Sequence, residues 1–273
     1  MLKIASWNIN SVRLRIGLVE RFLLEQAPDV LCLQEIKCRD SEFPSGNFRK
    51  LGYEHIATNG QKGYHGVAIA SRIPFTAIDK REFCEKGDAR HIAVDVAAGT
   101  QQTPVTIHNF YIPAGGDEPD PVANPKFAHK LQFFDELVDW QKNHSIANAN
   151  AVLVGDLNVA PLETDVWNHK ALLKVVSHTP IEVEKFTRVF DSGPWVDALR
   201  TKIPAHEKLF TWWSYRSPNW DEANKGRRLD HIWLSRSIAP ALQSVAVHRE
   251  ARGWDKPSDH APVTSLLDFS KLV

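Results

Sequence analysis

The chain has 273 residues, 43% of them hydrophobic, so it can bury a large core, and a single domain over residues 1–273 is expected. Its 33 acidic residues balance 33 basic ones, which excludes a strongly basic protein that coats nucleic acid. Three cysteines without metal-type spacing, no leader and no long apolar run favour a cytoplasmic protein that does not enter a membrane.

Strand-like apolar runs recur along the whole chain. The expected strands, in chain order, cover Leu2 to Ile9, Asp29 to Gln34, Glu54 to Ala57, Gly66 to Ser71, Phe75 to Lys80, His91 to Ala97, Pro104 to Ile112, Ala151 to Leu157, Leu229 to Ser235, Gln243 to His248 and Ala261 to Leu267. Helical periodicity appears over Leu14 to Leu24 and Lys126 to Asn143. Ser11 is expected to cap the first helix, and Asn124 with Pro125 the second. Because strands dominate, two packed β-sheets flanked by helices are expected.

Polar residues stand where the first two strands end. Asn8 closes the run that starts at Leu2, and Glu35 follows the apolar run Val30 to Gln34. A carboxylate at the mouth of a buried strand is costly unless it is paired or bound to a metal. An amide oxygen and a carboxylate together suit Mg²⁺ or Mn²⁺, and no His/Cys cluster offers the softer ligands that zinc prefers. The alternative is that Glu35 caps the next segment while Asn8 makes a turn.

A third polar segment follows the apolar run Ala151 to Val154. Gly155 permits close approach of the backbone, and Asp156 and Asn158 would face one way if strand geometry persists. Asp156 is therefore a candidate to orient or deprotonate an attacking water, and Asn158 a candidate donor to a phosphate oxygen. A strand followed by a simple Asp-Asn turn is the structural alternative.

Further acids and a histidine lie towards the C-terminus. We expect Asp230 to hydrogen-bond His260, because a carboxylate fixes the tautomer of an imidazole and raises its basicity. Asp259 is a second candidate metal ligand or water activator, or else a turn acid after Pro257. His231 should face the opposite side of its strand from Asp230, and we expect it to be structural.

Aromatic and basic residues complete the candidate site. The phenol of Tyr111 could donate to a phosphate oxygen or, if ionised, attack; a buried ring with a satisfied hydroxyl is the alternative. Trp212 could offer a ring face to a substrate, with core packing as the alternative. Local cations, among them Arg90, Lys225 and Arg228, could contact phosphates.

These segments belong to a longer pattern, which resembles the exonuclease III family of apurinic/apyrimidinic endonucleases. The similarity runs in order through SWNINSVR, DVLCLQEIK, YHGVAIASR, HNFYIPAGG, KFAHKLQFFDEL, LVGDLNVAP, GPWVDALR, FTWWSYRS, NKGRRLDHIWLS and KPSDHAPV. It implies a four-layer α/β sandwich and a Mg²⁺-dependent phosphodiesterase in which Mn²⁺ could substitute. The implied reaction is incision of DNA 5′ of an abasic site to leave a 3′-hydroxyl, with 3′→5′ exonuclease and 3′-phosphatase activity as possible companions. The implied partner is double-stranded DNA with abasic or blocked 3′ ends, and a monomer is expected.

The resemblance also implies roles for particular residues. The catalytic group is Tyr111, Asp156, Asn158, Asp230 and His260. The metal group is Asn8, Glu35, Asp156, Asn158, Asp259 and His260. The substrate-binding group is Trp212, Arg90, Lys225, Gly226 and Arg228. Gly226 would let the backbone approach a phosphate. Either Asp156 or His260 could take the proton from water; we favour Asp156 as the base beside a protonated His260, and one tightly held ion over two.

Three alternative functions make different demands on the sequence. The segments Asn168 to Lys185 and Ser217 to Glu222 are less family-like, so an exonuclease-dominant member with weak abasic-site activity is one alternative. A related phosphodiesterase acting on a non-DNA phosphoester, such as an inositol lipid or sphingomyelin, is another. A catalytically inactive DNA-binding module would have lost Glu35, Asp156 or His260, and none is lost.

Overall fold

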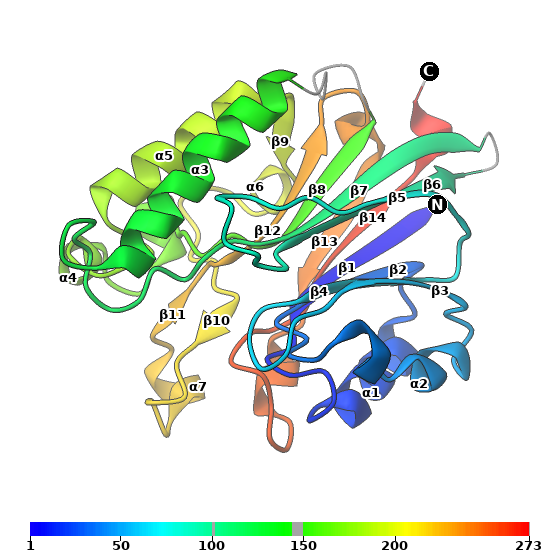
Figure 1. The fold of residues 1–273 in the computed structure, drawn as a ribbon, viewed down its shortest axis with the longest axis horizontal. Helices are drawn as coiled ribbons and strands as arrows, with labels where there is room; N and C mark the ends of the chain where they lie inside the picture. Colours follow the sequence, from blue (N-terminus) through cyan, green and yellow to red (C-terminus); the bar gives the residue numbers. More distant parts are fainter. Residues whose placement is uncertain (100–101, 144–149, 273) are drawn as a thin grey trace.

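Two six-stranded β-sheets packed face to face form the centre of the molecule (Figure 1). The computed structural model describes residues 1–99, 102–143 and 150–272. The first sheet has the order β13-β14-β1-β2-β4-β3 and consists of β1 (Leu2–Asn8), β2 (Val30–Gln34), β3 (His55–Asn59), β4 (Val67–Ser71), β13 (Leu242–Val247) and β14 (Val263–Leu267). The second has the order β5-β6-β7-β8-β12-β9 and consists of β5 (Phe75–Asp79), β6 (His91–Ala98), β7 (Thr103–Tyr111), β8 (Ala151–Asp156), β9 (Trp195–Asp197) and β12 (Asp230–Ser235). A small third sheet pairs β10 (Trp212–Trp213) with β11 (Gly226–Arg227).

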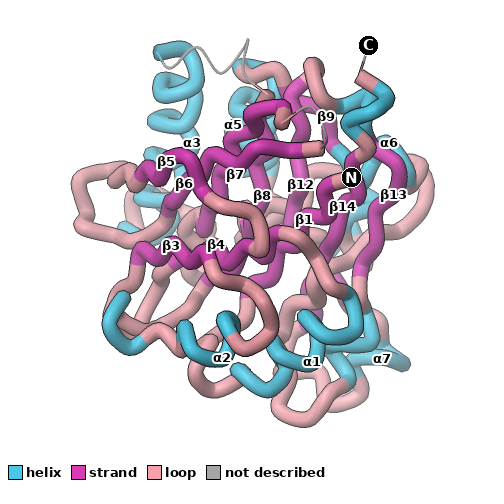
Figure 2. Tube along the Cα trace, turned by 90° about the vertical axis from the view of Figure 1, so that its right-hand side faces the viewer, coloured by secondary structure: helices cyan, strands magenta, loops and turns pink. Residues whose placement is uncertain are grey.

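Helices cover the outer face of each large sheet. Figure 2 shows the layers one above another, with α3 (Pro125–Asn143) and α5 (Pro180–Ser192) beyond the second sheet and α1 (Ile16–Gln26) and α2 (Ser45–Arg49) beyond the first. The connections carry the short helices α4 (His169–Leu172), α6 (Ala198–Lys202) and α7 (Trp220–Ala223). The predicted four-layer sandwich of two mixed sheets flanked by helices is confirmed. None of the helices in the described residues combines the length and hydropathy that crossing a membrane requires.

Apolar side chains on both faces of the central strands hold the layers together. In β2, Val30 and Cys32 belong to the core between the two sheets, whereas Leu31 and Leu33 belong to the layer beneath α1 and α2. A strand that is buried on both faces reads as a continuous apolar run, as this one does. Burial of this kind of surface contributes about 25 cal/mol per Å² and is the main favourable term in folding.

The start of the first helix differs from the prediction. Helix α1 begins at Ile16, and its N-cap residue Arg15 makes no side-chain cap. Ser11 has a φ of 86° and contributes its carbonyl oxygen, which accepts from the Arg15 N–H, so the prediction that its side chain caps the helix is wrong. Leu14 precedes the helix and is 64% exposed. Asn124 does cap the start of α3, since its side-chain Oδ1 accepts a hydrogen bond from the Lys126 N–H at 3.0 Å.

Several short elements were not predicted from the sequence, and neither were helix α5 and strand β9. Helix α5 begins with a capping box in which Thr179 and Glu182 satisfy each other's backbone N–H groups, a Thr-x-x-Glu signal that follows the usual rule. Strand β9 has only three residues, but it forms the edge of the second sheet beside β12. A strand this short carries too little alternation to be recognised by its pattern.

The ends of the central strands gather at one edge of the sandwich. β1 and β2 run parallel and end at Asn8 and Gln34, while β7 and β8 run parallel and end at Tyr111 and Asp156. Because parallel strands finish on the same edge of a sheet, each pair presents its last side chains together. β12 runs antiparallel to β8, so its first residue, Asp230, reaches the same edge.

Candidate active site

Asp156, Asp230 and His260 form the buried centre of the site. Asp156 of β8 lies opposite Asp230 of β12 in the antiparallel register. His260, in the turn before β14, places Nδ1 2.9 Å from Oδ2 of Asp230 and Nε2 3.6 Å from Oδ2 of Asp156. The turn is tied to the first sheet because Trp7 donates from Nε1 to the carbonyl oxygen of His260 at 3.0 Å. An imidazole therefore lies between two carboxylates, each from the second sheet.

Burial and neighbouring charges shift the pKa values of this group. Burial raises the pKa of Asp156 to about 7, against the lowering effect of His260 and with a contribution from Asp230. Burial opposes the charge on His260, but Asp230 and Asp156 overcome it and raise the pKa of His260 to about 10. At neutral pH His260 is thus protonated, and Asp156 is able to exchange a proton.

Asn8 joins this centre to Glu35. Its Nδ2 donates to Oε1 of Glu35 at 2.9 Å and to Oδ2 of Asp156 at 2.8 Å. The ammonium of Lys37 lies 2.8 Å from the other Glu35 oxygen. Burial disfavours ionisation of Glu35, but Lys37 and Asn8 outweigh it and hold the pKa of Glu35 below its ordinary value. An ionised carboxylate therefore faces the site from the first sheet.

The donor set around Glu35 fits a hard divalent cation. The Asn8 amide nitrogen bridges the carboxylates of Glu35 and Asp156, while its Oδ1 accepts from the Asn10 N–H at 3.1 Å. Mg²⁺ and Mn²⁺ prefer carboxylate and amide oxygens of this kind. Asp156, Asp230 and His260 form a second group, whose ligand atoms lie within 4.8 Å of one another. A protonated imidazole has no lone pair to offer a metal, so the group around Glu35 fits better.

Tyr111 lines the same cleft, at the end of β7. Burial, with Glu35 and Asp156, raises the pKa of the Tyr111 phenol well above its ordinary value, so the hydroxyl can donate a hydrogen bond but is not an ionised nucleophile. The guanidinium of Arg90 lies 5.0 Å from the ring centroid and donates to the Tyr111 carbonyl and to Asp88. Arg90 is only 5% exposed, so the predicted phosphate contact is corrected to a buried support for Tyr111.

A glycine in β8 and a buried lysine of α3 position the end of β8 and the turn that follows it. Gly155 has a φ of 144°, and a Cβ there would lie 1.9 Å from a carbonyl oxygen of β7. Asn158, with a φ of 55°, donates from Nδ2 to the Ile112 carbonyl at 2.8 Å. Lys130 of α3 donates to the carbonyl oxygen of Asn158 at 2.8 Å. The backbone that carries Asp156 and Asn158 into the site is therefore fixed from β7 and from α3.

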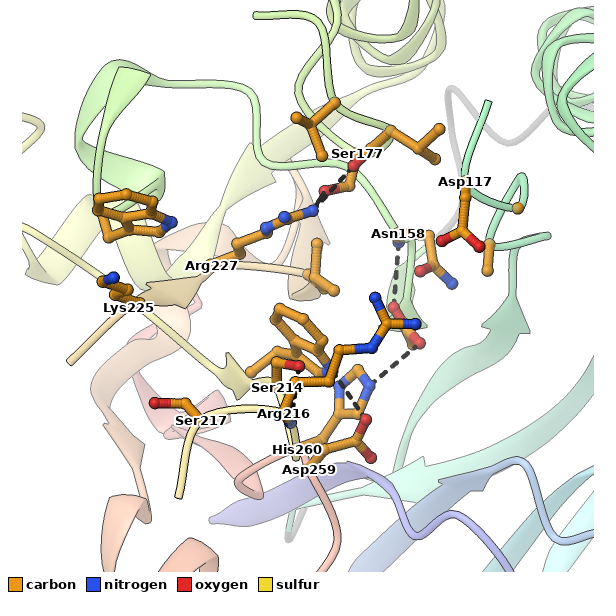
Figure 3. A pocket seen from close by; sticks show the side chains of 18 of the residues that line it. Asp117, Asn158, Ser177, Ser214, Arg216, Ser217, Lys225, Arg227, Asp259 and His260 are labelled. Carbon is orange, nitrogen blue, oxygen red and sulfur yellow. Dashed lines mark hydrogen bonds and ion pairs between the residues drawn. The ribbon is translucent and has the colours of Figure 1, made fainter. Parts of the chain in front are cut away.

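A pocket opens from this centre towards the β10–β11 hairpin (Figure 3). Trp212 lines it and is held because its Nε1 donates to Oδ2 of Asp259 at 2.9 Å. Asn10 donates to the other oxygen of Asp259 at 3.1 Å. Lys225 lines the same pocket, with its ammonium 5.0 Å from the ring centroid of Trp167. The pocket combines aromatic surfaces with positive charge.

Two residues predicted to contact substrate are part of the packing instead. Arg228 is fully buried and forms ion pairs with Asp165 and Asp197. Gly226 is buried in β11, where a Cβ would lie 2.6 Å from Phe210. A buried cation requires carboxylate partners and a crowded backbone requires a glycine, so both residues are explained without a phosphate.

The structure brings most of the predicted site residues together. The cleft is lined by Glu35, Tyr111, Asp156, Asn158, Trp212, Lys225, Asp259 and His260. Asn8 and Asp230 lie directly behind it, in contact with Asp156 and His260 respectively. Sequence reasoning missed the support that Lys130 gives to the Asn158 turn. A signal was present, because Lys130 shares the apolar face of α3 with Phe127 and Phe134, where a lysine is unexpected unless paired.

Comparison with known proteins matches residues 5–260 to the Endonuclease/Exonuclease/phosphatase family. The chain belongs to this family. It is 32% identical over 269 residues to exodeoxyribonuclease III of Haemophilus influenzae, a match that covers 96% of this chain and 98% of that protein. The resemblance to the exonuclease III family is confirmed, and family membership makes the protein a hydrolase of the nuclease type.

Solved structures of the same family share the fold over nearly the whole chain. One is the 3′ phosphatase NExo from Neisseria bound to a product DNA hairpin, with a TM-score of 0.88 and 32% identity, covering 98% of this chain and 100% of that chain. Another is an AP endonuclease from Archaeoglobus fulgidus, with a TM-score of 0.89 and 31% identity, covering 98% and 100%. The chain is thus similar to enzymes named for two kinds of reaction.

Proposed function

We propose that the protein is a Mg²⁺-dependent DNA repair phosphodiesterase that incises DNA 5′ of abasic sites and leaves a 3′-hydroxyl, with Mn²⁺ able to substitute. The observation that carries this proposal is the convergence of Asn8 and Glu35 from one sheet with Asp156 from the other and His260 at a single cleft. Hydrolysis of a phosphodiester near neutral pH needs a base, a charge-stabilising donor and hard-oxygen ligands, and these residues supply all three.

In this proposal Asp156 takes the proton from the attacking water, which its pKa near 7 suits. Protonated His260, held by Asp230, faces the negative charge that develops on the phosphate oxygens. Asn8 and Glu35 would hold the divalent cation, which when bound neutralises charge on the scissile phosphate. The division of labour follows because Asp156, with a pKa of about 7, can take up a proton, whereas His260, with a pKa of about 10, stays protonated.

The cleft lining would orient the DNA. Tyr111 would donate its protonated hydroxyl to a phosphate oxygen, and Asn158 its amide. Trp212 offers a ring face to an extruded sugar, and Lys225 offers charge to the backbone. The same attack at a 3′ end would give exonuclease and 3′-phosphatase activity, because all three reactions break the bond between phosphorus and a 3′ oxygen.

A labelled duplex carrying one tetrahydrofuran abasic analogue tests the proposal. The protein is incubated with it in Mg²⁺ and in EDTA, beside an intact duplex and one that ends in a 3′-phosphate. We expect a nick at the analogue only with the divalent ion and none within the intact duplex. Nicking that persists in EDTA, or equal cutting of undamaged DNA, would contradict the proposal.

A further inference from the structure

Arg227 lines the same pocket and carries a charge without a carboxylate partner. Its Nη1 donates to the carbonyl oxygen of Val176 at 2.9 Å and to Oγ of Ser177 at 2.8 Å (Figure 3). Its Nε is buried and has no hydrogen-bond partner. Within the described residues, no Asp or Glu oxygen lies within ion-pair distance of this guanidinium, in contrast to the neighbouring Arg228. A partly buried cation without an ion-pair partner is unusual.

The position of Arg227 is rigidly defined. The N–H of Ser177 donates to both oxygens of Glu182 at 2.9 Å each, and Glu182 is paired with Lys130 in a fully buried ion pair. On its other side, the guanidinium carbon of Arg227 lies 5.3 Å from the ring centroid of Trp212. The charge is therefore fixed between the ring that faces the substrate and a loop anchored on α3 and α5.

Apart from protonated His260 at the catalytic centre, the other Lys and Arg side chains that line the pocket, Arg216 and Lys225, are exposed. Water and salt screen exposed charges strongly, whereas a partly buried charge is screened much less. Arg227 is therefore the least screened cation on the pocket wall away from the catalytic centre.

We propose that Arg227 is a specificity-determining residue that favours a DNA strand ending in a 3′-phosphate over an internal abasic sugar. This inference rests on the proposed function. At an internal lesion, the phosphate oxygen that faces the pocket is esterified to a neutral sugar. In a terminal 3′-phosphate the same oxygen is free, and the group carries about −1.5 to −2 charges at pH 7. A fixed cation stabilises the more highly charged substrate, and an uncharged sugar gains nothing comparable from it.

The favoured reaction needs no reactant beyond water. The oxygen of water forms a bond to phosphorus, the bond from phosphorus to the 3′ oxygen breaks, and a proton that originates from water ends on that 3′ oxygen. The products are a 3′-hydroxyl end and inorganic phosphate. The 3′-hydroxyl is the end that a polymerisation reaction requires, so this reaction would precede a DNA-synthesis step.

Paired kinetics on two duplexes test the inference. One ends in a 3′-phosphate and the other carries an internal tetrahydrofuran analogue; kcat/KM is measured on both for wild type, Arg227→Leu, Arg227→Gln and Arg227→Lys. Loss of a charge-assisted contact predicts that the Leu and Gln variants lose about 10- to 100-fold on the 3′-phosphate and less than about 3-fold on the analogue. Arg227→Lys keeps the charge and retains most of the preference. Arg236→Leu, beyond the opposite end of β12, is the matched control and should change neither value.

The outcomes separate the inference from the proposed function. An equal loss on both duplexes, or an unchanged 3′-phosphate rate, overturns the role of Arg227. A wild-type protein that acts on neither duplex overturns the proposed function itself. If Arg227→Leu fails to melt cooperatively, Arg227→Gln replaces it in the test. Inhibition by inorganic phosphate is then measured for wild type and Arg227→Gln, and loss of the cation should weaken this inhibition about 10-fold or more.

Discussion

Asp230 lies directly opposite Asp156 across the antiparallel strands β12 and β8, and His260 lies within reach of both. Two buried carboxylates at this separation repel each other, and the cost is relieved by a proton on the imidazole or on one of the acids. Burial, with a contribution from Asp230, raises the pKa of Asp156 to about 7, and the two carboxylates together overcome burial to raise the pKa of His260 to about 10. The sheet register therefore creates both the base and the cation of the proposed reaction.

Asp230→Asn should reduce turnover about 100-fold or more, since an amide neither stabilises the imidazolium nor fixes its tautomer as a carboxylate does. Affinity for abasic-site DNA should stay within about 2-fold, because Asp230 lies behind the cleft. NMR titration should show a lower pKa for His260 in this variant. An equal loss of turnover and affinity would indicate a structural role for Asp230 instead.

Glu35→Ala should abolish Mg²⁺-dependent nicking, with a loss of about 100-fold or more, because it removes the main anionic ligand proposed for the metal. Calorimetry should show weaker Mn²⁺ binding, while the thermal unfolding temperature stays close to that of wild type. Lys37→Met is the matched control, because it removes a charge beside Glu35 without removing a proposed ligand. This variant should retain metal binding. Unchanged turnover in Glu35→Ala would remove the metal assignment.

Lys130→Met should destabilise the protein by about 3–5 kcal/mol, because the fully buried Glu182 would lose its only ion-pair partner in the described structure. Urea unfolding at pH 7 measures this change. The double variant Lys130→Met with Glu182→Gln should recover more than half of the loss, since no uncompensated charge is left. A double variant as unstable as the single one would show that the ion pair itself contributes the stability.

Acid should destabilise the protein through the buried pair His91 and His108, whose rings lie in hydrogen-bond contact. Burial lowers the pKa of His108 to about 4 and that of His91 well below its ordinary value. Between pH 6.5 and 4 the unfolded chain binds more protons at these histidines than the folded chain does. Their neutral forms therefore contribute stability fully above pH 6.5, and this contribution is lost as the pH falls. For His108 the loss is about 2 kcal/mol at pH 5. Calorimetric scans at pH 7 and 5 should show a smaller drop for His108→Leu than for wild type; an equal drop would assign the acid sensitivity elsewhere.

The sequence predicted the parts of the site that local pattern determines. Asn8, Glu35 and Asp156 each end or follow a recognisable strand, and alternation along β12 placed Asp230 and His231 on opposite faces. In the structure His231 contacts the Val159 carbonyl, away from the cleft. These positions follow from strand boundaries and side-chain alternation, which short stretches of sequence encode.

The features of the site that the sequence did not predict depend on contacts between distant parts of the chain. Nothing near Arg228 indicates that Asp165 and Asp197 neutralise it, and so it was predicted to contact DNA. Arg90 was misjudged for the same reason, because Tyr111 and His65, which its guanidinium contacts, come from other segments of the chain. The chemical type of a cation is visible in sequence, whereas its exposure is a property of the completed fold.

The chain returns to where it began, since β14 pairs with β1 from Leu2 opposite Leu267 to Ser6 opposite Val263. The imidazole of His260, just ahead of β14, can be seated only after this final strand has docked. During synthesis on the ribosome, the segments that carry Asn8, Glu35 and Asp156 emerge before the segment that carries His260. A chain that stops before His260 would consequently lack the proposed imidazolium, and we expect it to be inactive.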